Sequence, residues 1–343
     1  MHSLTALASL LLASLAVATP ATSPKNVTEL YRFSNATETE LENIAVRSNG
    51  QLIVTCANMD AIFIFDPSET DIVPKTIDTW PSGYSALGIT EVYPDVFAVN
   101  VGTLNSSNLT TVGPAEGTYS IWTLNFTTSD MPVAQKFIDL PQAGLLNGLT
   151  TVPGSGVIFT ADQINGTIFR IDMATAEISI TIDSPLLGSQ PYYNDNKLAL
   201  NGVRYHGQHL YVTDSSSAIF GRYRLNRDEW SWGGLELLGQ IQQNGTTNYD
   251  DLAVDDAGNA YVCIHPNALS LVQPDLTQTI FYIDETEQFN TPASVAFGRG
   301  IQANDTLYVV CSGSIADDGA VVGGALYRID LLPPSISSEV CAA

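Results

Sequence analysis

Four polar residues, widely spaced along the 343-residue chain, occupy the same place in a recurring sequence pattern. They are Glu42, Asn147, Asn201 and Asp250, and each stands two residues before an apolar residue of the pattern. Carboxylate and amide oxygens are the ligands that Ca²⁺, Mg²⁺ and Mn²⁺ prefer in proteins. If the fold brings the four side chains together, they predict a divalent-cation site. The alternative is that they hydrogen-bond to backbone and water without a metal.

The pattern that carries these residues starts as LENIAVRSNGQLIVT at residues 41–55 and returns five times. Each copy reads as an apolar strand, a turn with glycine or aspartate, and a second strand rich in β-branched or aromatic residues, which is typical of a β-hairpin. Successive copies are 43 to 60 residues apart, counted between their aligned apolar residues: Ile44, Ile89, Leu149, Val203, Leu252 and Val295. Two further strands fit into most units. A unit of this length with four strands predicts one blade of a β-propeller.

Six copies predict an all-β fold, a six-bladed β-propeller with four-stranded antiparallel blades. The sixth unit lacks a fourth strand, because the chain ends soon after ALYRIDLL at residues 325–332. We expect NVTELYRFS at residues 26–34 to supply that strand and close the ring, which would remove two open sheet edges. Since the first strand of each blade lines the central channel, the four polar residues should converge at its mouth. Three long connections, 102–117, 186–197 and 312–324, are expected to wall that mouth.

The repeats resemble those of the senescence-marker-protein/gluconolactonase group of six-bladed propellers. In that group a glutamate of the first blade, two asparagines and an aspartate bind a divalent metal. The resemblance assigns these roles to Glu42, Asn147, Asn201 and Asp250. Sugar-acid lactonases also contact substrate through an arginine two residues before the first asparagine, and here that position holds Leu145. This apolar replacement favours a less polar ligand than a sugar lactone.

The chain also resembles the secreted fungal propellers that are encoded with secondary-metabolite pathways. The LENIAVRSNGQLIVT opening, the chain length, the N-terminal segment and the glycosylation sequons carry this resemblance. Characterised members are hetero-Diels-Alderases, which join an ortho-quinone methide to a terpene olefin such as humulene on the way to tropolonic sesquiterpenoids. The resemblance implies an enzyme that needs no cofactor and takes small apolar or aromatic metabolites as substrates.

A pericyclase must hold two apolar partners in a reactive pose and aim hydrogen-bond donors at the carbonyl where charge develops. Aromatic residues on loops or strand entries are the candidates for the apolar walls: Trp80, Tyr84, Tyr192, Tyr193, Tyr249 and Phe289. For each of them the alternative is ordinary packing between blades. Asn147, Asn201 and His265 are candidate donors. His265 is expected beside Asp214, as a candidate acid–base pair.

Three functions from different classes therefore remain open. The first is a cofactor-independent hetero-Diels-Alderase. The second is a divalent-metal-dependent lactonase or esterase of the gluconolactonase type, in which Asp250 or Asp251 acts as base to a metal-bound water. The third is a non-catalytic propeller that binds a small molecule.

Residues 1–18 read as a cleaved secretory signal, with an apolar run from Leu4 to Val17 and the small-residue sequence Ala-Val-Ala at its end. The alternative is an uncleaved anchor. Residues 19–343 are then expected to form a single propeller domain in the secretory pathway or outside the cell. Eight N-x-S/T sequons agree with this route: Asn26, Asn35, Asn105, Asn108, Asn125, Asn165, Asn244 and Asn304. For any one of them the alternative is a plain turn asparagine.

The composition narrows the range of partners. The formal net charge is −23, from 36 acidic and 13 basic residues, so nucleic acid is an unfavourable partner. No stretch after the N-terminal run approaches a membrane-spanning length. Four cysteines are too few for a disulfide scaffold, and Cys341 could pair with Cys311 or Cys56, or all could stay unpaired together with Cys263. The sequence leaves the oligomeric state open.

Overall fold

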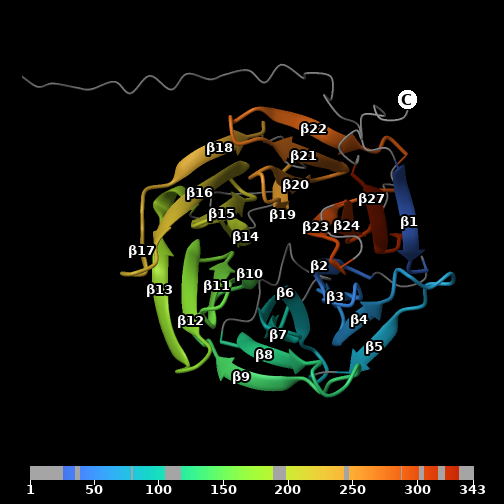
Figure 1. Ribbon diagram of the computed structural model, residues 1–343, viewed down its shortest axis with the longest axis horizontal. Helices are drawn as coiled ribbons and strands as arrows, with labels where there is room; N and C mark the ends of the chain where they lie inside the picture. The colour runs from blue at the N-terminus through green and yellow to red at the C-terminus, as the bar shows by residue number, and fades with distance from the viewer. Residues whose placement is uncertain are drawn as a thin grey trace, which may run out of the picture.

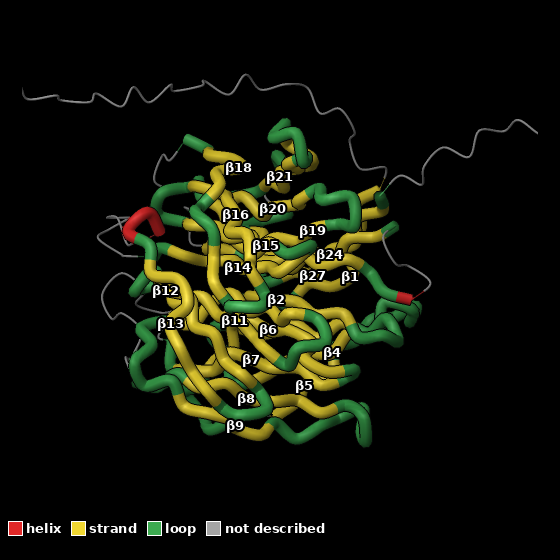
Figure 2. The backbone as a smooth tube through the Cα atoms, turned by 60° about the vertical axis from the view of Figure 1, so that its left-hand side comes forward, coloured by secondary structure: helices red, strands yellow, loops and turns green. Residues whose placement is uncertain are grey.

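The computed structural model describes residues 26–34, 39–78, 80–104, 117–187, 198–242, 247–286, 288–300, 305–315 and 321–331. Six antiparallel sheets of four main strands stand in a ring around a central axis (Figure 1). Strands joined by turns make up nearly all of this part of the chain (Figure 2). The predicted six-bladed propeller is confirmed. Within the described ranges, no helix has the length and hydrophobicity that a membrane crossing requires.

The first three blades follow the chain in order, from the channel outwards. Blade 1 consists of β2 (Leu41–Val46), β3 (Leu52–Cys56), β4 (Ala61–Phe65) and β5 (Lys75–Asp78). Blade 2 consists of β6 (Ser85–Tyr93), β7 (Val96–Gly102), β8 (Ser120–Asn125) and β9 (Gln135–Asp139). Blade 3 consists of β10 (Leu146–Val152), β11 (Val157–Asp162), β12 (Thr167–Asp172) and β13 (Glu177–Asp183), and a short 3₁₀ helix (Pro185–Leu187) follows it.

The other three blades complete the ring, with additions in two of them. Blade 4 consists of β14 (Leu200–His206), β15 (His209–Asp214), β16 (Ile219–Asn226) and β18 (Glu236–Gln240), and the short strand β17 (Ser231–Trp232) also pairs with β16. Blade 5 consists of β19 (Tyr249–Val254), β20 (Ala260–Ile264), β21 (Ala268–Val272) and β22 (Gln278–Ile283). Blade 6 consists of β23 (Pro292–Phe297), β24 (Thr306–Cys311), β27 (Ala325–Asp330) and β1 (Asn26–Arg32), with a small ribbon of β25 (Ser314–Ile315) and β26 (Val321–Val322).

The outer strand of blade 6 comes from the other end of the chain, as predicted. β1 pairs antiparallel with β27, from Asn26 opposite Asp330 to Arg32 opposite Ala325. The Arg32 guanidinium strengthens this closure, because it donates to the carbonyl oxygens of Gly323 at 2.9 Å and Gln288 at 2.8 Å. The ring is thus closed by hydrogen bonds between residues about 300 positions apart in the sequence.

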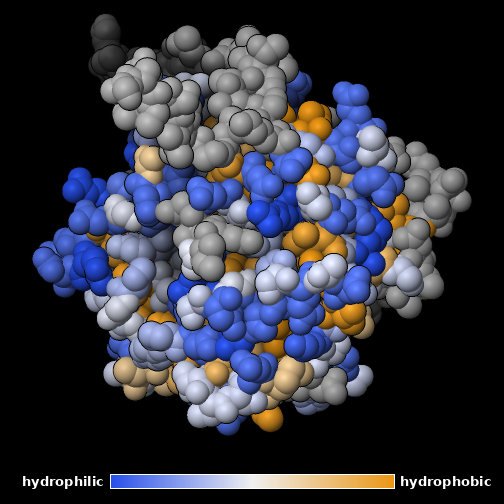
Figure 3. All heavy atoms as spheres, turned by 45° about the vertical axis from the view of Figure 1, so that its right-hand side comes forward, coloured by the Kyte–Doolittle hydropathy of each residue, from blue (hydrophilic) through white to orange (hydrophobic). Residues whose placement is uncertain are grey.

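The hydrophobic core is divided among the contacts between neighbouring blades. Six clusters of buried apolar side chains each combine residues of two adjacent blades, and together they cover all six interfaces. Blades 6 and 1, for example, share a cluster in which Tyr308 and Leu326 pack with Val54 and Phe63. Because every blade buries both of its faces in this way, each second strand reads as a nearly continuous apolar run. On the face seen in Figure 3, hydrophilic residues dominate the described surface.

The innermost strand of every blade carries a β-bulge near its start. The register shifts between Leu41 and Ile44 in β2, and at the corresponding place in β6, β10, β14, β19 and β23. A bulge places two residues opposite one on the partner strand and changes the direction of the side chains there. Glu42 and its counterparts in the other blades lie in these bulges. The recurring position in the sequence therefore corresponds to a recurring local geometry.

Neighbouring bulges approach each other closely, and three of them require glycine. A Cβ atom added to Gly148 would lie 2.5 Å from the carbonyl oxygen of Asn201, and one added to Gly88 would meet that of Asn147. Gly202 faces the Cα atom of Asp251 in the same way. Any other residue at these positions would force the first strands apart.

Candidate active site

The four polar residues of the repeat lie at the starts of β2, β10, β14 and β19. Asn147, Asn201 and Asp250 are buried, and Glu42 is partly buried. The Asn147 amide nitrogen Nδ2 donates to Glu42 Oε1 at 3.2 Å and to Gln163 Oε1 at 3.1 Å. Since Glu42 belongs to blade 1 and Asn147 to blade 3, this contact spans the central channel.

Asn201 connects the cluster to blade 5 through a serine. Its Nδ2 donates to Ser215 Oγ at 3.1 Å, and Ser215 Oγ donates to the carbonyl oxygen of Tyr249 at 2.9 Å. Tyr249 directly precedes Asp250 in β19. The other side-chain atom, Asn201 Oδ1, is buried and has no hydrogen-bond partner among the described residues. An unpaired buried acceptor is costly, so this atom is suited to a ligand that brings a donor or a cation.

His265 belongs to the same cluster, but its partner differs from the predicted one. Its Nε2 atom lies 3.0 Å from Asp250 Oδ2, and its Nδ1 atom lies 3.4 Å from Asn248 Nδ2. Asp214 instead accepts hydrogen bonds from the backbone and hydroxyl of Ser217, both at 2.8 Å. The predicted pairing of His265 with Asp214 is therefore wrong, because Asp214 fixes the turn that follows β15.

Burial and neighbouring carboxylates disfavour the charged form of both acidic residues in the cluster, Glu42 and Asp250. Burial raises the pKa of Glu42 well above its usual value, and repulsion by Asp250 and Glu40 raises it further. Burial likewise raises the pKa of Asp250, although the contact with His265 opposes that effect. Such a pair is stabilised by a bound proton or by a bound cation.

Beneath the cluster, a polar network ties four blades together at the next position of the repeat. Asp251 Oδ2 accepts hydrogen bonds from Asn43 Nδ2 at 3.0 Å, Ser294 Oγ at 2.8 Å and Arg204 Nη2 at 2.8 Å. Asn43, Asp251 and Ser294 occupy the bulge position that is glycine in the other three blades. The sequence analysis did not predict this network. Polar residues at a position that is glycine in the other blades would have indicated it.

At the opposite end of the channel lies a cavity of about 150 Å³. Arg204 and Arg299 line it together with apolar residues of the first strands. Arg204 thus lies between this cavity and Asp251.

Three of the six aromatic residues proposed as pocket walls prove to be core residues. Tyr249 and Phe289 are fully buried, and Trp80 is 8% exposed. Phe289 packs edge-on against Tyr282 at 5.0 Å between ring centroids, and the Trp80 indole nitrogen donates to the carbonyl oxygen of Tyr84. For Trp80, Tyr249 and Phe289 the wall prediction is wrong, because their large apolar rings fill the interfaces between blades.

Other predicted wall and modification residues have different outcomes. Tyr84 is partly buried against the same cluster as Trp80, and Tyr192 and Tyr193 lie outside the described residues. Among the sequons, Asn26, Asn125 and Asn165 are described and exposed. Asn165 Nδ2 donates to Asp162 Oδ2 at 2.8 Å, as a turn asparagine would. The sequons outside the described residues are Asn35, Asn105, Asn108, Asn244 and Asn304.

The described cysteines, Cys56, Cys263 and Cys311, are buried free thiols. Burial raises the pKa of Cys56 to about 12, so that the thiol stays neutral. Cys341 lies outside the described residues, together with the signal segment 1–18 and the middle of each long connection.

Comparison with known proteins supports the resemblance that the repeats indicate. No protein-family model matches the sequence. A protein of Sarocladium schorii with the provisional name hetero-Diels-Alderase asR5 is 26% identical over 216 residues, which cover 57% of this chain. The match spans only about half of that relative's length, at 52%. A second protein, from a Phoma species and also provisionally named hetero-Diels-Alderase, is 23% identical over 82% of this chain and 85% of its own length.

Solved structures confirm the fold. A luciferin-regenerating enzyme has a TM-score of 0.63 at 16% identity, covering 90% of this chain and 95% of its own. A protein provisionally named gluconolactonase has a TM-score of 0.57 at 14% identity, covering 91% and 93%. Virginiamycin B lyase from Staphylococcus aureus has a TM-score of 0.53 at 13% identity, covering 90% and 99%. The expected resemblance to hetero-Diels-Alderases and to gluconolactonase-like propellers is confirmed.

Proposed function

We propose that this chain is a hetero-Diels-Alderase that couples an ortho-quinone methide to a terpene olefin such as humulene at the channel mouth. The observation that carries the proposal is the convergence of Glu42, Asn147, Asn201, Asp250 and His265 from four blades. The relatives named hetero-Diels-Alderases add support for the reaction class. We further propose that the protein works in the secretory pathway or outside the cell, as the N-terminal segment and the sequons suggest.

The reaction explains why such a site needs polar groups but no cofactor. A carbon–carbon bond forms at the methide carbon and a carbon–oxygen bond at the quinone oxygen, while three π bonds become two σ bonds and one new π bond. No proton or electron is lost or gained. Electron density moves from the olefin towards the quinone oxygen, so a donor placed beside that oxygen stabilises the transition state. Asn201 is the first proposed donor, because one hydrogen of its Nδ2 has no partner among the described residues. Asn147 and His265 are the other proposed donors, and each would exchange a present partner, Glu42 or Asp250, for the substrate oxygen.

The proposal is tested by generating the quinone methide in solution with humulene and measuring the rate and the enantiomeric excess of the adduct. Loss of one preorganised donor costs about 10²–10³ in rate in comparable sites. We therefore expect Asn147→Ala and Asn201→Ala to lose at least about tenfold in rate together with the enantiomeric excess. The control is Asn49→Ala, in the exposed turn before β3. A racemic adduct at the uncatalysed rate with the unmutated protein would refute the proposal.

A second function is favoured by one specific observation. The two carboxylates with raised pKa values and the unpaired Asn201 Oδ1 would all be satisfied by a hard cation. The donor types fit such an ion, and Glu42, Asn201 and Asp250 would hold it with Asn147 beside them. Among the described residues, no group of three or more His, Cys, Asp or Glu side chains is arranged to hold a metal, so amide and water oxygens would have to complete the shell. A bound metal would supply a Lewis acid for a lactonase or esterase.

Metal dependence separates the two functions. Ca²⁺ and Mn²⁺ are titrated into EDTA-treated protein, and the thermal midpoint and the hydrolysis of apolar lactones are followed. A rise in midpoint that Asn201→Ala abolishes, together with metal-dependent hydrolysis, favours the lactonase. If EDTA abolishes the coupling reaction, a cofactor-independent pericyclase is excluded. The third function, a non-catalytic binding propeller, is favoured if Asn147→Ala and Glu42→Ala leave every assayed conversion unchanged.

A further inference from the structure

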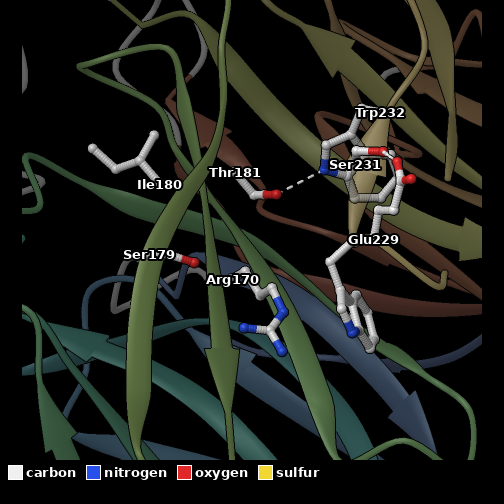
Figure 4. Close-up of a pocket in the computed structure, with 8 residues that line it drawn as sticks. Arg170, Ser179, Ile180, Thr181, Glu229, Ser231 and Trp232 are labelled. Carbon is white, nitrogen blue, oxygen red and sulfur yellow. Dashed lines mark hydrogen bonds between the residues drawn. The ribbon is translucent and has the colours of Figure 1, made fainter. Parts of the chain in front are cut away.

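A cavity separate from the channel mouth lies at the outer strands of the ring. It has a volume of about 570 Å³ and opens on the outer rim of the ring, between blades 3 and 4. Figure 4 shows its lining, with Arg170 and Thr181 on the blade 3 side and the segment from Glu229 to Trp232 on the blade 4 side. That segment is the tip of the β16–β17 hairpin, which is additional to the four main strands of blade 4. A cavity of this size fits one or two small rings.

Arg170 places a cation in this cavity whose hydrogen-bond donors are only partly used. Its guanidinium lies 4.7 Å from the ring centroid of Trp230, and its side chain is only 14% exposed. Its Nε atom is buried and has no hydrogen-bond partner among the described residues. Its Nη2 atom forms a long ion pair of 3.8 Å with Asp172 Oδ2, while Asp172 Oδ1 accepts hydrogen bonds from the backbone of Ala174 and Thr175. Stacking uses the face of a guanidinium, so the donors in its plane stay free for a ligand carboxylate.

Two indole rings form an apolar wall beside this cation. Trp232 is fixed from two sides, because its Nε1 donates to Thr181 Oγ1 at 2.8 Å and its ring packs edge-on against Phe159 at 5.1 Å. Trp230 lies against the same phenylalanine at 6.2 Å. Both tryptophans remain partly exposed. Rigid, partly exposed rings offer a flat apolar surface to a ligand ring at little cost in side-chain entropy.

The lining also contains a hydrogen-bond acceptor, the Glu229 carboxylate, and a hydroxyl group, that of Thr181. The Glu229 carboxylate accepts hydrogen bonds from Asn226 Nδ2 at 3.1 Å and from Ser231 Oγ at 3.2 Å, which fixes its position and leaves it acceptor capacity. The Thr181 hydroxyl accepts from Trp232, so its own hydrogen is available to a ligand. The site therefore offers acceptors for ligand hydroxyl groups as well as donors for a ligand anion.

We propose that this cavity is a binding site for an acidic sugar ring of the hexuronate class. The ring carboxylate would pair with Arg170, the hydroxyl groups with Glu229 and Thr181, and the apolar ring face with the indoles. Other ligand classes leave part of the site unused. A simple anion makes no use of the indoles or of the hydroxyl-binding groups Glu229 and Thr181, and a neutral sugar makes no use of the charge of Arg170. The site is independent of the reaction at the channel mouth.

The test is a titration of the purified protein with D-glucuronate, D-glucose and acetate, followed by tryptophan fluorescence and by saturation-transfer NMR of the ligand. We expect glucuronate to bind at least about tenfold more tightly than either comparator, since hydrogen bonds to a charged group raise affinity by about tenfold or more. Arg170→Met should reduce glucuronate binding to the level of glucose, and Trp230→Ala should weaken both sugars. Arg328→Met, which makes the same charge change on β27 of blade 6, is the matched control.

Three results would overturn the proposal. They are the absence of saturation transfer to glucuronate, equal binding of acetate and glucuronate, and unchanged glucuronate binding in Arg170→Met. If Arg170→Met does not fold, Arg170→Lys decides, because it keeps the charge but loses the planar fork. We expect that variant to bind glucuronate at least about tenfold more weakly than the unmutated protein, and unchanged binding there would equally refute the site.

Discussion

At the scale of single residues, the cluster at the channel mouth contains two buried carboxyl groups whose charged forms are disfavoured. Glu42 and Asp250 lie in the same partly desolvated site, and the pKa of each is raised, first by burial. The folded protein therefore holds protons that the unfolded chain releases. Below the usual carboxyl pKa, both states are protonated and the effect on stability vanishes. As the pH rises above that value towards the raised pKa, the unfolded state loses its protons first, and the free energy of unfolding falls.

Stability should consequently be greater at mildly acidic than at neutral pH. We expect Glu42→Gln to reduce the decline, because glutamine keeps the shape and cannot ionise. Urea unfolding between about pH 5 and about pH 8 measures this slope. The exposed Glu177→Gln in β13 is the control and should leave the slope unchanged. Identical slopes in Glu42→Gln and in the unmutated protein would contradict the assignment of the raised pKa to Glu42.

The repeat correctly predicted which residues meet at the mouth, but not all of their partners. Glu42, Asn147 and Asp250 stand at equivalent bulges, so their register could be read from spacing alone. The partner of His265 could not, because an aspartate such as Asp214 can either face a ligand or hold a turn. The structure shows that Asp214 holds the turn, because it accepts hydrogen bonds from Ser216 and Ser217.

At the scale of elements, the bulged first strands decide how closely the blades pack around the axis. A side chain at Gly148 would collide with the backbone of β14, which is held in its own sheet and cannot move aside cheaply. The same holds for Gly88 and Gly202, which face backbone atoms of the next first strand. Glycine is thus required here for close approach between strands and not for an unusual backbone conformation.

We expect Gly148→Ala to lower the free energy of unfolding by about 1–3 kcal/mol or more, the range typical of overpacked cores. It should also weaken the proposed coupling activity, because Asn147 is its neighbour. Gly234→Ala is the matched control, since an added Cβ there meets no atom within 4 Å. Chemical denaturation of both variants measures the difference. Equal stability of the two would show that the first strands can move apart.

At the scale of the whole molecule, stability depends on closing the ring. Each blade buries its faces against two neighbours, so an open ring would expose one interface and two sheet edges. β1 forms six residue pairs with β27, and Arg32 donates hydrogen bonds to the carbonyl oxygens of Gly323 and Gln288. The pairing of β1 with β27 therefore contributes to the stability of the whole ring.

A chain that begins at Phe33, and so lacks β1, is expected to be less stable by several kcal/mol, at about 1 kcal/mol for each lost hydrogen bond. Its exposed β27 edge should also favour self-association. Size-exclusion chromatography with light scattering and thermal unfolding measure both effects. A chain that begins at Asn26 is the control. If the shorter chain stays monomeric with an unchanged thermal midpoint, β1 is not the closing element.

The sequence by itself determined the number of blades, the closing strand and the residues that face the channel mouth, because each follows from a local pattern repeated at regular intervals. Tertiary structure alone decided that Asn147 bonds to Glu42 across the channel, that His265 contacts Asp250, and that Trp80, Tyr249 and Phe289 fill the core. The physical reason is that such contacts join different blades. Their distances depend on how the six sheets close around a common axis, and no local spacing encodes that closure.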